Sequence, residues 1–181
     1  MDIFLSQVLN GLQLGSIYAL VALGYTMVYG IILLLNFAHG DIIMVGAYVS
    51  WLVMAQLGLN PIIAILLSVV ACTLVGVLID KVAYAPLRNA PRLSILITAI
   101  GVSYFLENGA QLVFGADPKV VPAFTDVSTI KLGDIALSFP AVVTVLVTIV
   151  ATIALTLLVQ KSKLGKAMRA VSEDMGAARL M

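Results

Sequence analysis

The amino-acid sequence predicts an all-α integral membrane protein with about five membrane-spanning helices. Of its 181 residues, 62% are hydrophobic and only 10% are charged, and the mean hydropathy is +1.14. A soluble domain is about 45–50% apolar with about 25% charged residues, so too few charges remain here to cover a surface that faces water. The apolar residues also form long continuous runs instead of alternating, which favours helices over the strands of a membrane barrel.

Five apolar stretches carry this prediction, at residues 8–35, 42–58, 61–79, 93–114 and 140–159. A helix needs about 20 residues to cross a hydrocarbon core of about 30 Å, so the second and third stretches are short but adequate. The first stretch would form about 42 Å of helix, and it must therefore tilt, protrude or break. It carries no Lys or Arg before residue 31 and no cleavage motif, so we expect it to stay in the mature protein.

The distribution of Lys and Arg predicts the orientation, because these residues concentrate on cytoplasmic loops. Residues 80–92 hold three Lys or Arg and one acid, and residues 160–181 hold five and two acids. We expect both segments to be cytoplasmic. Residues 107–134 hold two lysines and four acids, so we expect them outside. Three spans before residue 80 then place the N-terminus outside.

The polar segment before the last span contains the pattern of a short β-hairpin. Ile130 and Leu132 alternate with polar residues before Gly133-Asp134, and the alternation resumes after it. A two-residue turn that starts with glycine is typical of hairpins. The sequence therefore predicts a possible hairpin in this outer loop.

The first candidate functional segment runs from Asn36 to Asp41. His39 and Asp41 stand between two apolar runs with no spacer. One interpretation is an ordinary short cytoplasmic loop. The other is a break between helix segments, where helix ends and exposed backbone groups meet a ligand near the membrane midplane. On the second interpretation Asn36, His39 and Asp41 are candidates for a substrate path.

A tyrosine stripe is the second candidate. Tyr18, Tyr25 and Tyr29 share one helix face, and they extend over about 16 Å of helix, so they cannot all lie in one interfacial belt. We expect at least one hydroxyl to find a partner inside the bundle. Tyr25 and Tyr29 are therefore further candidates for the substrate path, with simple packing as the alternative.

A pair of glycines on the same stretch has the spacing of a helix-packing motif. Gly11 and Gly15 are four residues apart, and small residues at this spacing let two membrane helices approach closely. We interpret them as packing residues with no part in a ligand site.

The third candidate is the C-terminal segment 160–181, which has the spacing of an amphipathic helix. Its apolar side comprises Leu164, Ala167, Met168, Val171, Met175 and Ala178. One interpretation is a helix that lies on the membrane surface. The acids Glu173 and Asp174 favour the other interpretation, a docking helix for a cytoplasmic partner.

The sequence excludes several classes of function. It has one histidine, one cysteine, no metal-spaced ligands and no glycine-rich phosphate loop, so it predicts no catalytic site, no metal and no cofactor. A net charge of +1 gives no reason to expect nucleic-acid binding. We expect Cys72 to be a buried, inert thiol. If ATP is used, another subunit must bind it.

Several motifs of the chain resemble a known family. The matching segments are Asn10-Gly11, Leu14-Gly15-Ser16-Ile17-Tyr18-Ala19-Leu20, Gly24-Tyr25-Thr26-Met27-Val28-Tyr29-Gly30, Asn36-Phe37-Ala38-His39-Gly40-Asp41, Gly46-Ala47-Tyr48, Ala83-Tyr84-Ala85-Pro86-Leu87-Arg88, Ile100-Gly101-Val102-Ser103, Leu164-Gly165-Lys166-Ala167-Met168-Arg169-Ala170, Glu173-Asp174 and Ala177-Ala178. With these motifs the chain resembles the H-type permease subunits of bacterial ABC importers for branched-chain amino acids.

The resemblance implies a multi-pass permease domain in the bacterial inner membrane. It implies a second permease subunit, two cytoplasmic ATPase subunits and a periplasmic substrate-binding protein as partners, with membrane lipid around them. It also implies that the C-terminal segment is the loop that couples the permease to the ATPase. The coupling candidates are Lys166, Arg169, Glu173, Asp174 and Ala177.

Members of this family continue beyond the coupling loop with further spans, so we expect residues 1–181 to be the N-terminal part of a permease domain, as a fragment or a truncated gene product. Three alternatives stay open. The first is a permease for urea or short amides, which resembles the same family. The second is a truncated membrane subunit that transports nothing. The third, a secondary transporter or channel, predicts ionisable residues near span centres, and only His39 and Asp41 qualify.

Overall fold

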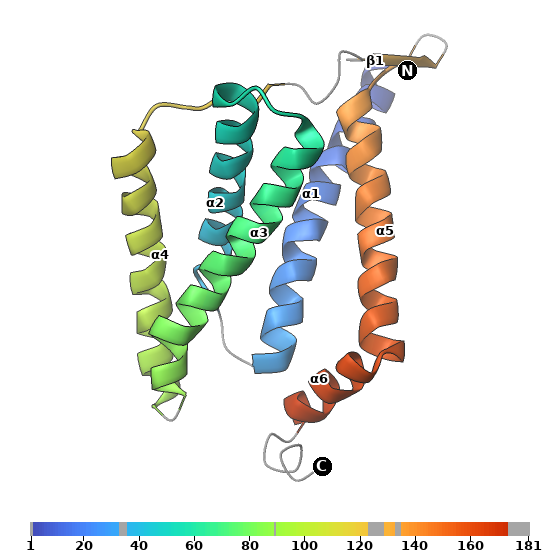
Figure 1. Cartoon of the computed structure of the whole chain (residues 1–181). Coiled ribbons are helices and arrows are strands. Elements are labelled where there is room, and N and C mark those ends of the chain that lie inside the picture. The colour runs from blue at the N-terminus through green and yellow to red at the C-terminus, as the bar shows by residue number, and fades with distance from the viewer. Residues whose placement is uncertain (1, 33–35, 89, 123–128, 133–134, 174–181) are drawn as a thin grey trace. The chain divides into compact units, whose positions relative to one another are not determined.

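The computed structural model describes residues 2–32, 36–88, 90–122, 129–132 and 135–173 (Figure 1). The chain forms two compact units. The first consists of residues 1–33 and 125–181, and the second of residues 34–124. In the described residues both units are almost entirely helical, as the composition predicts.

Four helices in the described part of the chain are long and apolar enough to cross a membrane, namely Phe4–Gly30, Pro61–Leu87, Leu93–Phe114 and Phe139–Lys161. They coincide with four of the five predicted apolar stretches, and the number of spans stays a prediction. The predicted stretch 42–58 forms the short helix α2 (His39–Trp51), which continues as the π-helix η1 (Leu52–Gln56). The polar His39 and Asp41 lower the hydropathy of this helix, and its status as a fifth span stays a prediction.

The first unit is built on α1 (Asp2–Ile32), an unbroken helix of 31 residues. It is about 46 Å long, so tilting or protruding remain as the ways to fit a core of about 30 Å. Alongside it runs α5 (Phe139–Lys161). The two helices are joined where the buried Thr148 hydroxyl donates to the Ser16 carbonyl oxygen at 3.3 Å.

A short antiparallel pair of strands precedes α5. Strand β1 (Thr129–Leu132) pairs with β2 (Ile135–Ser138), with Thr129 opposite Ser138 and Leu132 opposite Ile135. The pairing lies where the alternation of the sequence predicts a hairpin. After α5 the unit ends in α6 (Lys163–Glu173).

The second unit contains α2, α3 (Pro61–Ile79) and α4 (Arg92–Phe114). Asn60 caps α3, because its side-chain oxygen accepts from the Ile62 N–H at 2.9 Å, and Pro61 occupies the first helical position, where its missing N–H costs nothing. The helix then runs on through the π-helix η2 (Asp80–Tyr84) and the 3₁₀-helix η3 (Ala85–Leu87). The helix therefore extends beyond the predicted apolar stretch 61–79, as far as Leu87.

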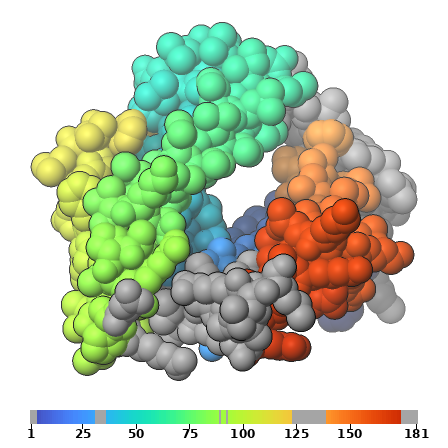
Figure 2. Space-filling view, turned by 60° about the horizontal axis from the view of Figure 1, so that its bottom comes forward, coloured from blue at the N-terminus to red at the C-terminus, as the bar shows by residue number. Residues whose placement is uncertain are grey.

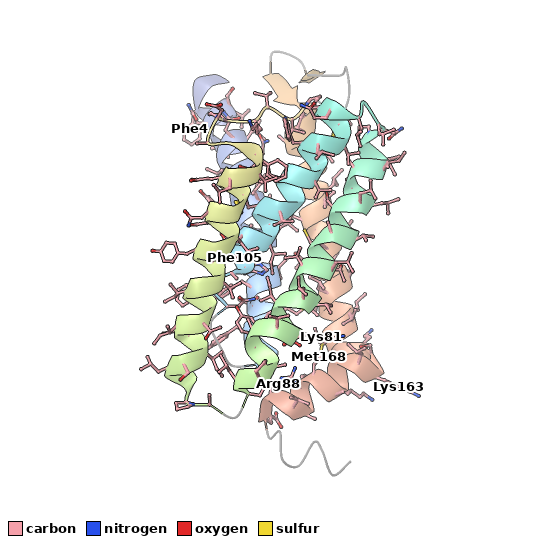
Figure 3. All side chains as sticks on the ribbon, turned by 60° about the vertical axis from the view of Figure 1, so that its left-hand side comes forward. Phe4, Lys81, Arg88, Phe105, Lys163 and Met168 are labelled. Carbon is pink, nitrogen blue, oxygen red and sulfur yellow. The ribbon has the colours of Figure 1, made fainter. Side chains whose placement is uncertain are left out.

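The continuation through η2 and η3 has a simple cause. Asp80 and Lys81 follow the apolar part of the helix, and their charged side chains can reach water without ending it. The exposed carboxylate of Asp80 pairs with Arg88 at 3.2 Å, and Pro86 is accepted in the first turn of η3. Lys81 and Arg88 lie at the same end of this unit (Figure 3).

A polar ladder holds α2 against α3. The Ser50 and Ser68 hydroxyls are 2.8 Å apart, the Ser68 hydroxyl donates to the Gly46 carbonyl oxygen at 3.0 Å, and the Cys72 thiol donates to the Ile42 carbonyl oxygen at 3.3 Å. Gly46 permits this approach, because a Cβ atom there would lie 2.9 Å from the Cys72 sulfur. Cys72 is half-buried, and its thiol has a structural role as a donor.

We expect Ser68→Ala to weaken this helix pair measurably, because it removes both hydrogen bonds of the hydroxyl. Such bonds contribute about 0.6 kcal/mol each between membrane helices, so the free energy of unfolding should fall by about 1 kcal/mol. Unfolding in mixed micelles measures this change. Thr73→Ala is the matched control, because among the described residues the Thr73 hydroxyl bonds the Val69 carbonyl of its own helix and no other helix. An equal loss in both variants contradicts the ladder.

An aromatic cluster joins the other ends of α2 and α4. Tyr48 and Phe114 stack with ring centroids 4.4 Å apart, and Trp51 meets Phe114 edge-on at 6.3 Å. The Lys119 ammonium lies 5.5 Å from the centre of the Trp51 ring. Tyrosine and tryptophan concentrate at the membrane–water boundary, so this cluster is typical of a helix end at that level.

Candidate substrate path and coupling segment

The start of α2 lies part-way along α3, as Figure 1 shows. The hydrogen bond from Cys72 fixes Ile42 at the level of Cys72, and Cys72 follows Pro61 by eleven residues, or about 16 Å of helix. Measured from Pro61, a hydrocarbon core of about 30 Å extends well beyond this level. The N-terminus of α2 therefore lies at a level between the two ends of α3.

The residues just before α2 lie beside η2, the continuation of α3. Asn36 to Ala38 are not helical, and the Asn36 side-chain oxygen accepts from the Tyr84 hydroxyl at 2.8 Å. Tyr84 belongs to η2, a π-helical turn of a kind often found at functional sites. Which of the two interpretations of this segment holds, the short loop or the helix break, stays a prediction.

The N-terminus of α2 is uncapped. Ala38 occupies the N-cap position and offers no side-chain acceptor. The His39 N–H bonds the Asn36 carbonyl at 3.2 Å and the Ile42 N–H bonds the Ala38 carbonyl at 3.1 Å, but in the described residues no acceptor reaches the N–H groups of Gly40 and Asp41. Open space adjoins Gly40, since a Cβ atom there would meet nothing within 4 Å.

Asp41 is the most unusual polar residue of this segment. Its side chain is buried, with 7% of the residue exposed, and its Oδ2 atom has no hydrogen-bond partner in the described part of the chain. Buried polar atoms are almost always paired, and an ionisable group inside a membrane is costly to keep. An orphaned carboxylate oxygen at a helix start therefore marks a candidate ligand site.

The two candidate tyrosines lie on α1, in the other unit. Tyr25 is half-buried and Tyr29 is 42% exposed. A common path with Asn36, His39 and Asp41 stays a prediction. The packing role of Gly11 and Gly15 also stays a prediction, because a Cβ atom at either one would meet nothing within 4 Å in the described residues.

Sequence reasoning misses a cavity of about 280 Å³ between α1 and α5. Its lining is apolar apart from two threonines and one glutamine, and comprises Leu23, Thr26, Met27, Leu155, Thr156, Val159 and Gln160. The two helices are over a hundred residues apart in sequence, and no spacing rule connects them.

The corner between α5 and α6 is built from specific contacts. The Ser162 hydroxyl accepts from the Gly165 N–H at 2.8 Å and donates to the Leu158 carbonyl, as an N-cap does. Gly165 is buried, and a Cβ atom there would overlap the carbonyl oxygens of Leu158 and Val159. As a result the chain turns sharply from the end of α5 into α6 (Figure 1), and the two helices form the orange and red part of Figure 2.

The structure gives Arg169 a contact within the chain. Its guanidinium donates to the Gln160 carbonyl oxygen at 3.3 Å, where a cation complements the negative end of α5. Lys166 and Glu173 are exposed on α6, and Lys163 points outward (Figure 3). Asp174 and Ala177, the other coupling candidates, lie outside the described residues.

Comparison with known proteins places the chain in a family of transporters. Residues 7–181 match the family described as branched-chain amino acid transport system / permease component. The chain is 37% identical to the high-affinity branched-chain amino acid transport system permease protein BraD of Pseudomonas aeruginosa. It is 40% identical to LivH of Salmonella typhimurium and 39% identical to LivH of Escherichia coli K12, which carry the same description.

Each of these alignments covers 98% of this chain and 62% of the relative. The chain thus spans about three fifths of the length of the curated relatives it matches. No solved structure matches it.

Proposed function

Because the chain belongs to the family of permease components of branched-chain amino acid transport systems, we propose that it forms part of the membrane path of an ABC importer for branched-chain amino acids. It is a membrane protein with a transport role, located by this proposal in the bacterial inner membrane. Its partners are a second permease subunit, two cytoplasmic ATPase subunits that hydrolyse ATP, and a periplasmic substrate-binding protein.

The observation that carries the proposal is the position of the start of α2, which lies at a level between the two ends of α3 in the same unit. Helix ends and non-helical backbone at membrane depth are tolerated where they line a cavity or are buried in protein, and transporters use them to hold substrates. The buried Asp41, with Asn36 and His39, supplies polar groups at this place. Tyr25 and Tyr29, on α1 in the other unit, are the further residues that we propose for a substrate path.

The proposed orientation follows the positive charges. Segments 80–92 and 160–181 are cytoplasmic, residues 107–134 are outside, and α2 with η1 serves as the fifth span. The aromatic cluster of Trp51, Tyr48 and Phe114 supports an outer boundary at that end of unit 2. The N-terminus is then outside.

Helix α6 is the proposed coupling element. Closure of the ATPase dimer moves α6, and the tight corner at Gly165 carries the motion to α5, so that the path alternates between two states with different affinity for substrate. Lys166, Glu173, Asp174 and Ala177 contact the ATPase, and Arg169 fastens α6 to α5 through Gln160.

Uptake of radiolabelled substrates tests the proposed function. Cells that lack their own branched-chain importers receive the permease with these residues together with its ATPases and binding protein. We expect energy-dependent uptake of leucine, isoleucine and valine, which an excess of urea or acetamide does not inhibit. Uptake of urea without uptake of the amino acids assigns the permease to the alternative substrate class.

Charge reversal on α6 is expected to separate membrane insertion from ATPase binding. Glu173→Lys alters the exposed surface of α6, and Arg169→Glu places a negative charge against the negative end of α5. We expect at least tenfold less ATPase to co-purify with either variant, with equal amounts of permease in the membrane. Asp117→Lys, an exposed change in the proposed outer segment, is the control; full ATPase recovery with both α6 variants contradicts the coupling role.

A further inference from the structure

The orphaned carboxylate of Asp41 and the uncapped start of α2 lie within one helical turn of each other. We infer that together they bind a zwitterion: the Asp41 carboxylate binds the ammonium group of the transported amino acid, and the N–H groups of Gly40 and Asp41 bind its carboxylate. This inference rests on the proposed function and assigns the substrate-binding groups of that path.

The first step concerns Asp41. A buried carboxylate is ordinarily paired with a cation or with several donors, because removing it from water is costly. Oδ2 has no hydrogen-bond donor in the described residues, and the described ion pair joins Asp80 to Arg88 at the exposed end of the unit. Lys119 lies near Trp51 at the opposite end. An ammonium group from outside the chain supplies the missing donors.

The second step concerns the helix end. The N-terminus of α2 carries a partial positive charge from the helix dipole, and free N–H groups at such an end bind carboxylates and phosphates. Ala38 offers no side-chain cap. The space next to Gly40 is open, because a Cβ atom there would meet no described atom within 4 Å. The carboxylate of a small ligand can reach these donors.

The third step concerns selectivity. Gly40 and Asp41 are adjacent, so the donors and the orphaned carboxylate are a few ångströms apart, as are the ammonium and carboxylate groups of an α-amino acid. Each half of the zwitterion has an opposite charge to meet. A neutral amide such as urea carries neither charge and gains only weaker hydrogen bonds, and an amine or an acid gains one of the two charged contacts.

Infrared difference spectroscopy tests the assignment directly. The purified permease in lipid nanodiscs is mixed with L-leucine, with 3-methylbutylamine, which lacks the carboxylate, or with 4-methylpentanoate, which lacks the ammonium group. We expect leucine and the amine to shift a protein carboxylate band, and the acid to leave it unshifted. The leucine-induced shift should disappear in Asp41→Asn and return in part in Asp41→Glu.

Asp80→Asn is the matched control, because Asp80 is an exposed carboxylate of the same unit; it should keep the full shift. A leucine-induced shift of equal size in Asp41→Asn overturns the inference. So does an equal shift with 4-methylpentanoate, or no shift with leucine at any concentration up to saturation of uptake.

Leucine uptake by the assembled importer, measured in parallel, separates this inference from the proposed function. We expect Asp41→Asn to reduce uptake at least tenfold and Asp80→Asn to leave it unchanged. Wild-type uptake by Asp41→Asn overturns the Asp41 site and leaves the importer standing. A band shift that depends on Asp41, without uptake by the wild-type protein, supports the site and contradicts the transport function.

Discussion

Replacing Gly165 by alanine is expected to abolish import while leaving the permease in the membrane. The alanine Cβ would overlap the carbonyl oxygens of Leu158 and Val159, and these backbone atoms of α5 cannot rotate away as a side chain can. Forcing an atom into a packed site costs about 1–3 kcal/mol, which is enough to release α6 from the end of α5. The proposed coupling to the ATPase then fails.

Two measurements follow the effect of Gly165→Ala. Leucine uptake should fall to background, and limited proteolysis should cut at α6 much faster than in the wild type. Gly109→Ala is the control, because a Cβ atom at Gly109 meets nothing within 4 Å. Normal uptake by Gly165→Ala, or an equal loss in Gly109→Ala, contradicts the role of this corner.

Gly46→Leu is expected to separate α2 from α3. A Cβ atom at residue 46 already lies 2.9 Å from the Cys72 sulfur, and leucine adds three more carbon atoms. The displacement would break the bonds from Ser68 to Gly46 and from Cys72 to Ile42. We expect a loss of about 1–3 kcal/mol in the free energy of unfolding, and leucine uptake should fall with it.

Thermal unfolding in detergent measures the loss in Gly46→Leu. Gly76→Leu, on α3, is the control, because open space surrounds a Cβ atom at that position. Adding Cys72→Ala to Gly46→Leu should recover part of the stability, because it removes the sulfur that the new side chain meets. Equal unfolding temperatures for Gly46→Leu, Gly76→Leu and the wild type contradict the close approach of the two helices.

The features that the sequence predicts correctly are those that depend on local pattern. Long apolar runs give the four candidate spans, and the alternation around residues 133–134 gives the strand pair. Pro61 marks the start of α3, because a proline is favoured at the first helical position. These signals need no knowledge of which helices touch.

The features that the sequence misses depend on contacts between distant residues. The depth of α2 is set by the bond from Cys72 to Ile42, thirty residues apart, and the cavity in unit 1 needs α1 and α5 side by side. Arg169 is predicted to face a partner, but its guanidinium also has an acceptor in the Gln160 carbonyl. The sequence pattern describes side chains, so it cannot predict that a backbone carbonyl at a helix end will accept a hydrogen bond from Arg169.

We propose that this chain belongs to an importer that other subunits complete. Affinity purification of the tagged chain from its native membrane, solubilised in a mild detergent and followed by mass spectrometry, is the test of this assembly. We expect recovery of an ATPase and a second permease of the same system. A chain that is inserted in the membrane but brings down neither partner, in this form and in any longer product of its gene, contradicts it.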